Sequence, residues 1–151
     1  MGVLTIWESA QFRVSQAGKV YLPGYLLVES RSGKRDLKEL SPQEDRSLLA
    51  ALDLAKTLLN KRIKPRRIFV VKDREARDRL RFHVIPGTAE VLGAEALDGT
   101  ASSQQGAEIA QSVCSRFTEG ATIYGAIELL DFVSEARGLC RELQSASGNG
   151  G

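Results

Sequence analysis

The sequence predicts an α+β domain with an antiparallel sheet of about five strands, one main helix and further helices toward the C-terminus. Short apolar runs bounded by turn residues lie on both sides of one strongly amphipathic segment, and the last third has helical periodicity. The length of 151 residues fits one domain with its own core.

Two short segments before residue 31 have strand character. Residues 11–15 (QFRVS) alternate weakly between apolar and polar side chains, and residues 24–30 (GYLLVES) form an apolar run of strand length. Turn residues at 17–19 and 23–24 separate them. We therefore expect two strands joined by a connection with turns.

The main helix is predicted over residues 41–61. Ser41 can cap its first turn, Pro42 suits the first helical position, and Glu44 completes a capping box. Apolar side chains then recur at three- and four-residue steps, which gives the helix one apolar face. These side chains are Leu48, Leu49, Leu52, Ala55, Leu58 and Leu59.

Two stronger strands follow, over residues 66–72 (RRIFVVK) and 79–86 (RLRFHVIP), with a polar connection over 73–78. Because side chains alternate along a strand, the second strand places Arg79, Arg81 and His83 on one face. Its other face carries apolar side chains.

The pattern changes after Pro86-Gly87. Residues 93–106 are rich in Gly, Ala, Ser and Gln and predict a loop, after which a helix begins near Ser102-Ser103 and ends near Gly120. A second helix is expected over 122–143, and we expect these helices to pack on the sheet rather than on a partner. The tail over 144–151 has the composition of a disordered segment.

Composition excludes several classes of protein. The sequence has one histidine, which rules out a metal site built from several histidines, and Cys114 and Cys140 lack metal-type spacing. Neither a secretory signal nor a membrane-spanning run of roughly 18 apolar residues is evident. We expect a cytoplasmic protein with reduced thiols, no membrane association, and no metal or cofactor.

Basic residues are concentrated in the middle of the chain. Residues 61–81 hold 10 of the 21 basic residues and 3 acidic ones, whereas residues 82–151 hold 3 basic and 9 acidic ones. A cluster of this kind can bind phosphate or nucleic acid, or it can be a solvated basic face. Along 79–83, two guanidiniums and one imidazole share a face, which favours an anion site if they are not simply exposed.

The segment RLRFHVIPGT resembles the signature strand of the histidine-triad (HIT) superfamily, His-φ-His-φ-His-φ-φ, with His83 at the third histidine. YLPGYLLVES, RDLKELSPQE and RRIFVVKDREA resemble preceding family segments, so the similarity covers about residues 7–90. The resemblance implies a HIT-like core over 1–92, with 93–143 as a C-terminal helical extension of the same domain. It also implies a nucleotide ligand and a homodimer.

The triad itself is degenerate in this sequence. By the resemblance, Arg81 stands where the family has its nucleophilic histidine, and Arg79 stands at the first histidine. Gly33 replaces a further motif histidine, and Gln16 aligns with an expected ribose-binding acid. An arginine stays protonated and cannot attack phosphorus, so the pattern indicates a retained scaffold that has lost the family's reaction.

Four functions remain open. The leading hypothesis is a non-catalytic protein that binds a nucleotide or other phosphate through Arg79, Arg81, His83, Lys72 and Arg74. The second is a nucleotide hydrolase or nucleotidyl transferase with a site shifted to His83, and the third is a nucleic-acid binder using residues 61–81. The fourth is a protein-interaction module.

Overall fold

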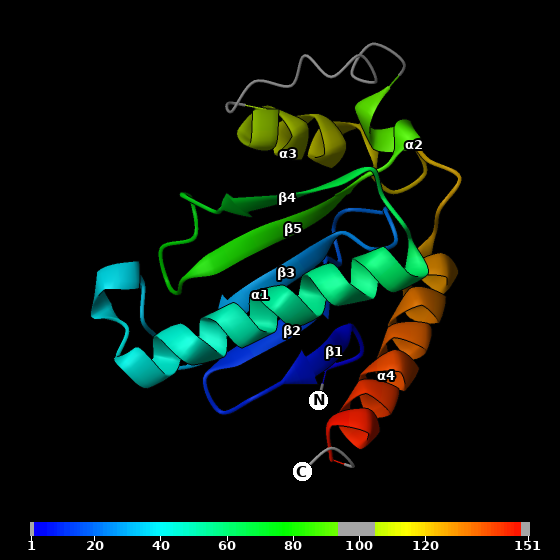
Figure 1. Ribbon diagram of the computed structural model, residues 1–151. Coiled ribbons are helices and arrows are strands. Elements are labelled where there is room, and N and C mark those ends of the chain that lie inside the picture. Colours follow the sequence, from blue (N-terminus) through cyan, green and yellow to red (C-terminus); the bar gives the residue numbers. More distant parts are fainter. Residues whose placement is uncertain (1, 94–104, 149–151) are drawn as a thin grey trace.

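The computed structural model describes residues 2–93 and 105–148, and it contains one five-stranded sheet. The strand order is β1-β2-β3-β5-β4, and every neighbouring pair is antiparallel (Figure 1). The strands are β1 (Thr5–Glu8), β2 (Phe12–Gln16), β3 (Leu26–Ser30), β4 (Arg67–Lys72) and β5 (Arg81–Gly87). The predicted fold class is confirmed.

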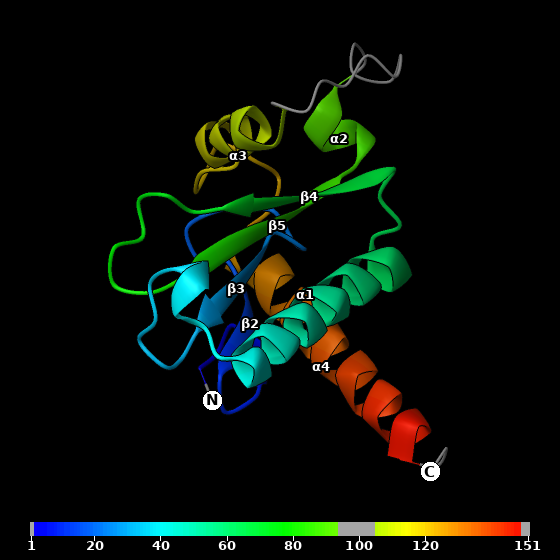
Figure 2. The same ribbon diagram turned by 60° about the vertical axis from the view of Figure 1, so that its left-hand side comes forward.

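Helices lie on both faces of this sheet (Figures 1 and 2). Helices α1 (Pro42–Arg62) and α4 (Ala126–Gly148) pack on one face, where they share a core with inward-facing residues of β2, β3 and β5. Helix α3 (Gln105–Arg116) lies on the opposite face, over β4. The short helices are η1 (Leu37–Glu39) and α2 (Ala89–Leu92).

The start of α1 follows the predicted capping box. The Ser41 hydroxyl accepts a hydrogen bond from the Glu44 backbone N–H, and the Glu44 carboxylate accepts one from the Ser41 N–H. These bonds lower the pKa of Glu44, because they favour its charged form. Ile63 is the C-cap of the helix, and Lys64 after it adopts a positive φ of 56°.

The C-terminal helices pack mainly on their own chain, as predicted. Val113 and Phe117 are buried on the α3 side of the sheet, and Val133 is buried on the α1 side. Leu130, by contrast, is 44% exposed. Cys114 and Cys140 are free thiols.

Three features differ from the sequence prediction. Strand β1 was not expected, because a four-residue strand is too short to show a clear alternation. Strand β5 begins at Arg81 instead of 79, because Leu80 turns its backbone N–H to the carbonyl of Lys34 in the loop before η1. Helix α4 continues to Gly148, past the predicted end at 143.

Some expectations concern residues outside the described part of the chain. Most of the predicted loop over 93–106, including the helix start near 102–103, and the last residues of the tail, 149–151, fall there. Within the described residues, no helix is both long enough and apolar enough to cross a membrane.

Candidate functional site

His83 lies on the central part of β5, between Leu27 of β3 and Val71 of β4. Its Nδ1 lies 2.6 Å from the Tyr25 hydroxyl oxygen, and its Nε2 lies 3.0 Å from Asp73 Oδ2. The Tyr25 ring meets the imidazole edge-on, with 5.5 Å between ring centroids. Both ring nitrogens of His83 are therefore in hydrogen bonds within the protein.

Asp73 is the centre of this arrangement and follows directly after β4. Its Oδ1 accepts hydrogen bonds from the backbone N–H groups of Glu75 and Ala76, and its Oδ2 accepts from His83. Partial burial raises the pKa of the carboxyl, but these hydrogen bonds more than offset it, so the pKa of Asp73 lies below its ordinary value. Asp73 is therefore a carboxylate near neutral pH.

The charge state of Asp73 fixes the proton on His83. A carboxylate only accepts hydrogen bonds, so His83 Nε2 carries a proton and donates it to Asp73. In the neutral ring, Nδ1 then accepts a hydrogen bond from the Tyr25 hydroxyl. Burial raises the pKa of Tyr25 well above its usual range, which keeps this hydroxyl protonated. The second neighbour of the hydroxyl is Cys114 Sγ, at 3.7 Å.

Arg81 is held by two carboxylates. Its Nε and Nη2 lie 3.2 and 3.1 Å from Glu29 Oε2, and its Nη1 lies 3.5 Å from Asp73 Oδ2. Glu29 is its cross-strand partner on β3, which explains why the side chains meet. The charge of this guanidinium is thus compensated inside the protein.

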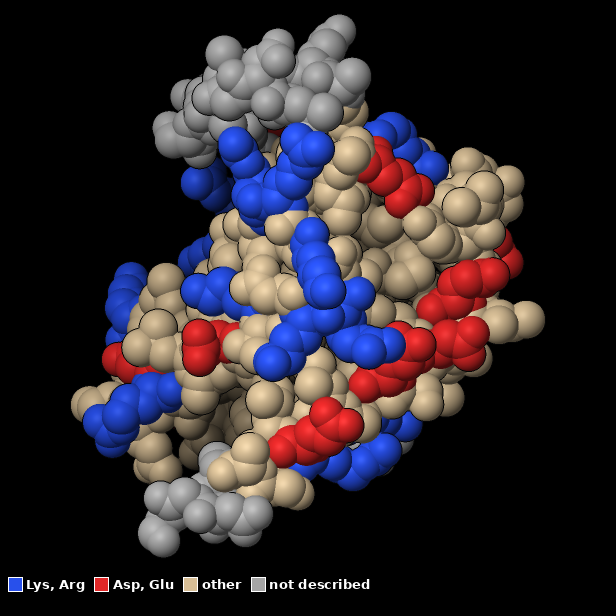
Figure 3. All heavy atoms as spheres, turned by 45° about the vertical axis from the view of Figure 1, so that its right-hand side comes forward, with Lys and Arg blue, Asp and Glu red and all other residues tan. Residues whose placement is uncertain are grey.

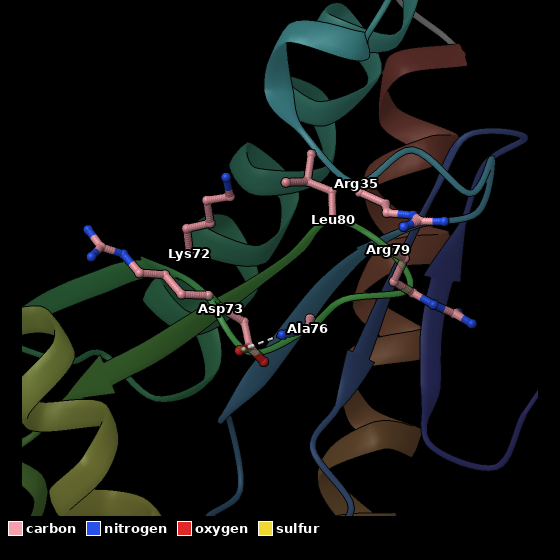
Figure 4. A pocket seen from close by; sticks show the side chains of 7 residues that line it. Arg35, Lys72, Asp73, Ala76, Arg79 and Leu80 are labelled. Atoms are coloured by element: carbon pink, nitrogen blue, oxygen red, sulfur yellow. Dashed lines mark hydrogen bonds between the residues drawn. The ribbon is translucent and has the colours of Figure 1, made fainter.

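The other cationic residues of the prediction line a hollow where β4 ends and β5 begins (Figure 4). Its volume is about 390 Å³. The lining residues are Arg35, Lys72, Asp73, Arg74, Ala76, Arg79 and Leu80. Figure 4 shows Lys72 on one side of the hollow and Arg35 and Arg79 on the other.

The predicted row of cations therefore divides into two groups. Lys72, Arg74 and Arg79 line the hollow, whereas Arg81 and His83 make hydrogen bonds or ion pairs with carboxylates of the protein. Asp73 belongs to both groups, because it lines the hollow and contacts both Arg81 and His83.

Sequence reasoning missed four residues of this site. Arg35 comes from the loop before η1, and nothing in the sequence links it to the β4–β5 connection. Asp73 follows β4 directly, and the hairpin register, which places Lys72 opposite Phe82, brings it next to Arg81. Tyr25 directly precedes β3 and Glu29 lies within it. Only the pairing of β3 with β5, which the sequence does not reveal, brings them to His83 and Arg81.

Helix α3 covers the sheet face beside His83. Val113, Phe117 and Ile109 pack with Tyr25 and with apolar side chains of β4 and β5. Gly106 brings the helix so close to β4 that an added Cβ would lie 3.1 Å from a methyl group of Val71. The face that the resemblance would give to catalysis is thus partly occupied by the chain itself.

The basic stretch over 61–81 is split by β4. Lys61, Lys64 and Arg66 are exposed where α1 ends and β4 begins, and Figure 3 shows Lys and Arg side chains gathered on that face. Arg62 and Arg67 lie at this same end, and the basic residues from Lys72 to Arg81 lie at the other end of the strand. Phe82 is buried and Phe69 is packed against the core, so neither presents an open stacking surface to nucleic acid.

No protein-family model matches the chain, and no curated protein matches it. Several solved structures, however, are similar to this chain. A zinc-bound histidine triad family protein from Mycobacterium smegmatis shares 12% identity at a TM-score of 0.59, covering 94% of this chain and 86% of that one. A Hit-like protein from Bartonella henselae, described as involved in cell-cycle regulation, shares 18% identity at a TM-score of 0.52, covering 76% and 87%.

The chain has a HIT-like fold. A HIT family protein from Bacillus anthracis is also similar, with 16% identity, a TM-score of 0.51 and coverage of 74% of this chain and 83% of that one. At these identities the likeness is one of fold. Among the described residues of this HIT-like chain, no three His, Cys, Asp or Glu side chains lie together as a metal site would require.

Proposed function

We propose that this HIT-like protein binds a phosphate-bearing ligand, with nucleotides among the candidates, in the hollow between the β4–β5 connection and the loop before η1. The observation that carries the proposal is that four of the residues lining one hollow are cationic. In the described part of the chain, the side chains of Arg35, Lys72 and Arg74 make no ion pair with a carboxylate. Uncompensated like charges in one place are favourable when an anion joins them.

The residue types suit phosphate. Arg74 and Arg35 offer planar guanidiniums that can bind two phosphate oxygens at once, and Lys72 offers a point charge with three donors. Arg79 pairs with Asp78 at 3.1 Å, but Asp78 is exposed, so a phosphate can compete for this guanidinium at little cost.

Within this proposal, Arg81 and His83 position the site and do not contact the ligand. Both hold Asp73, whose other oxygen fixes the first turn of the β4–β5 connection. That turn sets the places of Lys72 and Arg74 on either side of Asp73.

The same contacts support a loss of nucleotidyl-histidine chemistry. By the resemblance, the nucleophile's position belongs to Arg81, and a guanidinium is not a nucleophile. His83 lies one two-residue step along the strand, roughly 7 Å away. Its Nε2 carries a proton and its Nδ1 accepts from Tyr25, so neither lone pair is free to attack phosphorus.

The test incubates the protein with nucleotides and dinucleoside polyphosphates and follows product formation and thermal stability together. We expect stabilisation without turnover. Turnover that His83→Ala abolishes while the fold is retained would establish the hydrolase or transferase alternative. Absence of both signals would contradict the proposal and favour a protein-interaction role.

A further inference from the structure

The hollow differs from an ordinary nucleotide pocket in what lines it. Small-molecule sites are mostly apolar and aromatic, with a few polar groups that fix orientation. Here four of the seven lining residues are Lys or Arg, and the lining contains no aromatic side chain. The apolar members are Ala76 and Leu80, and Leu80 is only 1% exposed because it belongs to the core.

A base would find no aromatic ring to stack on in the lining of the hollow, where only the guanidinium planes of Arg35, Arg74 and Arg79 are available. Proteins hold unpaired bases by stacking them on aromatic rings or guanidinium planes and by hydrogen bonds to their edges. The phenylalanines of the adjoining strands, Phe69 and Phe82, pack into the apolar clusters on the two faces of the sheet and do not line the hollow. Recognition at the hollow therefore depends on its cationic side chains, not on aromatic stacking.

The amount of charge indicates more than one phosphoryl group. Asp73 is already satisfied by His83, Arg81 and two backbone N–H groups, which leaves the three unpaired cations for a ligand, together with Arg79, whose partner Asp78 is exposed. One phosphoryl group carries about −1.5 to −2 near neutral pH. Two or three such groups are needed to balance the hollow.

The arrangement of the cations agrees with an extended anion. Lys72 lies across the hollow from Arg35 and Arg79 (Figure 4). A chain of linked phosphoryl groups can contact both sides at once, whereas a single phosphate is compact.

We infer that the hollow recognises a linear chain of two or more phosphoryl groups, and that an attached nucleoside adds little to the affinity. This inference rests on the proposed function, because it concerns the same site. It excludes AMP-like ligands and includes inorganic pyrophosphate, tripolyphosphate and the polyphosphate portion of a nucleoside triphosphate.

The experiment is calorimetric titration of the whole chain at constant ionic strength in magnesium-free buffer. The ligands are orthophosphate, pyrophosphate, tripolyphosphate, AMP, ATP and adenosine. We expect tripolyphosphate and ATP to bind within about three-fold of each other, orthophosphate and AMP to bind about ten-fold more weakly or worse, and adenosine not to bind.

A matched pair of variants locates the site. Arg74 and Arg66 are both exposed arginines at opposite ends of β4, and neither side chain makes an ion pair in the described part of the chain. Arg74→Gln is expected to weaken tripolyphosphate binding by about ten-fold, because it removes a charge-assisted hydrogen bond. Arg66→Gln, with the same change in net charge, should alter it less than about two-fold.

The results of these titrations distinguish a failure of the polyphosphate inference from a failure of the proposed function. Binding of ATP or AMP at least ten-fold tighter than tripolyphosphate would overturn the inference and leave the proposed function standing. Failure of every phosphate compound to bind would overturn the proposed function itself. Equal weakening by Arg74→Gln and Arg66→Gln would show diffuse attraction to the basic chain and would contradict both.

Discussion

Replacing Arg81 by methionine should destabilise the protein far more than it weakens ligand binding. Methionine keeps an unbranched apolar stem but removes the guanidinium that joins Glu29 to Asp73. Asp73 retains His83 as a partner, whereas no other side chain of the described residues bonds to the Glu29 carboxylate. The variant therefore leaves one carboxylate without compensation.

The size of the effect follows from burial. The side chains of Arg81, Glu29 and Asp73 are 29%, 11% and 17% exposed, so the cluster lies between a surface pair and a buried one. Breaking a fully buried pair costs about 3–5 kcal/mol, and an exposed pair contributes about 0–1 kcal/mol. We expect a loss of about 2 kcal/mol, which corresponds to a Tm about 4–8 °C lower for a chain of this size.

The assay is urea and thermal unfolding of wild type, Arg81→Met, Glu29→Met and the double variant at neutral pH. The double variant should recover much of the lost stability, because it removes both charges together. Tripolyphosphate affinity of Arg81→Met should stay within about three-fold of wild type. An Arg81→Met protein as stable as wild type but unable to bind tripolyphosphate would refute this reasoning and make Arg81 a ligand contact.

Three further predictions concern the frame of the site. Gly87→Ala should lower the free energy of unfolding in urea by about 2 kcal/mol, because the new Cβ would lie 2.7 Å from the Arg67 carbonyl oxygen. Gly138→Ala, in an open part of α4, should raise it by about 0.5–1 kcal/mol. Equal effects of the two substitutions would disprove the steric argument. The pKa of Asp73 is lowered in the folded protein, so the stability that this carboxylate contributes is present above its ordinary pKa and is lost as pH falls below about 4. Asp73→Asn should therefore flatten this part of the curve of unfolding free energy against pH. An unchanged curve would contradict the prediction. Ser41→Ala removes the cap of α1 and should lower the free energy of unfolding, measured by thermal unfolding, by about 1 kcal/mol. An unchanged free energy of unfolding would show that the cap is dispensable.

Local sequence signals predicted most of the fold. The capping box and the leucine spacing predicted α1, and the apolar runs over 66–72 and 79–86 predicted the strands β4 and β5. These signals act over a few residues, so one sequence suffices to find them. The four-residue β1 and the turn of the chain at Leu80 depend on tertiary hydrogen bonds, which no local pattern reveals.

The candidate site was predicted in part. Lys72, Arg74 and Arg79 were identified from the basic composition of the β4–β5 region. Alternation correctly placed Arg81 and His83 on one face, but it did not show what compensates their charges. Glu29 is 52 positions from Arg81 in sequence, and only the pairing of β3 with β5 brings the two together.

The most direct test of the account is to titrate tripolyphosphate into ¹⁵N-labelled protein and follow the backbone amide resonances. The account predicts the largest shifts at Arg35 and over 72–80, with little change at Arg66 and Arg67. Shifts centred instead on Tyr25, on Cys114 of α3 and on the β5 amide of His83, with the hollow unchanged, would contradict it and return the ligand to the triad strand.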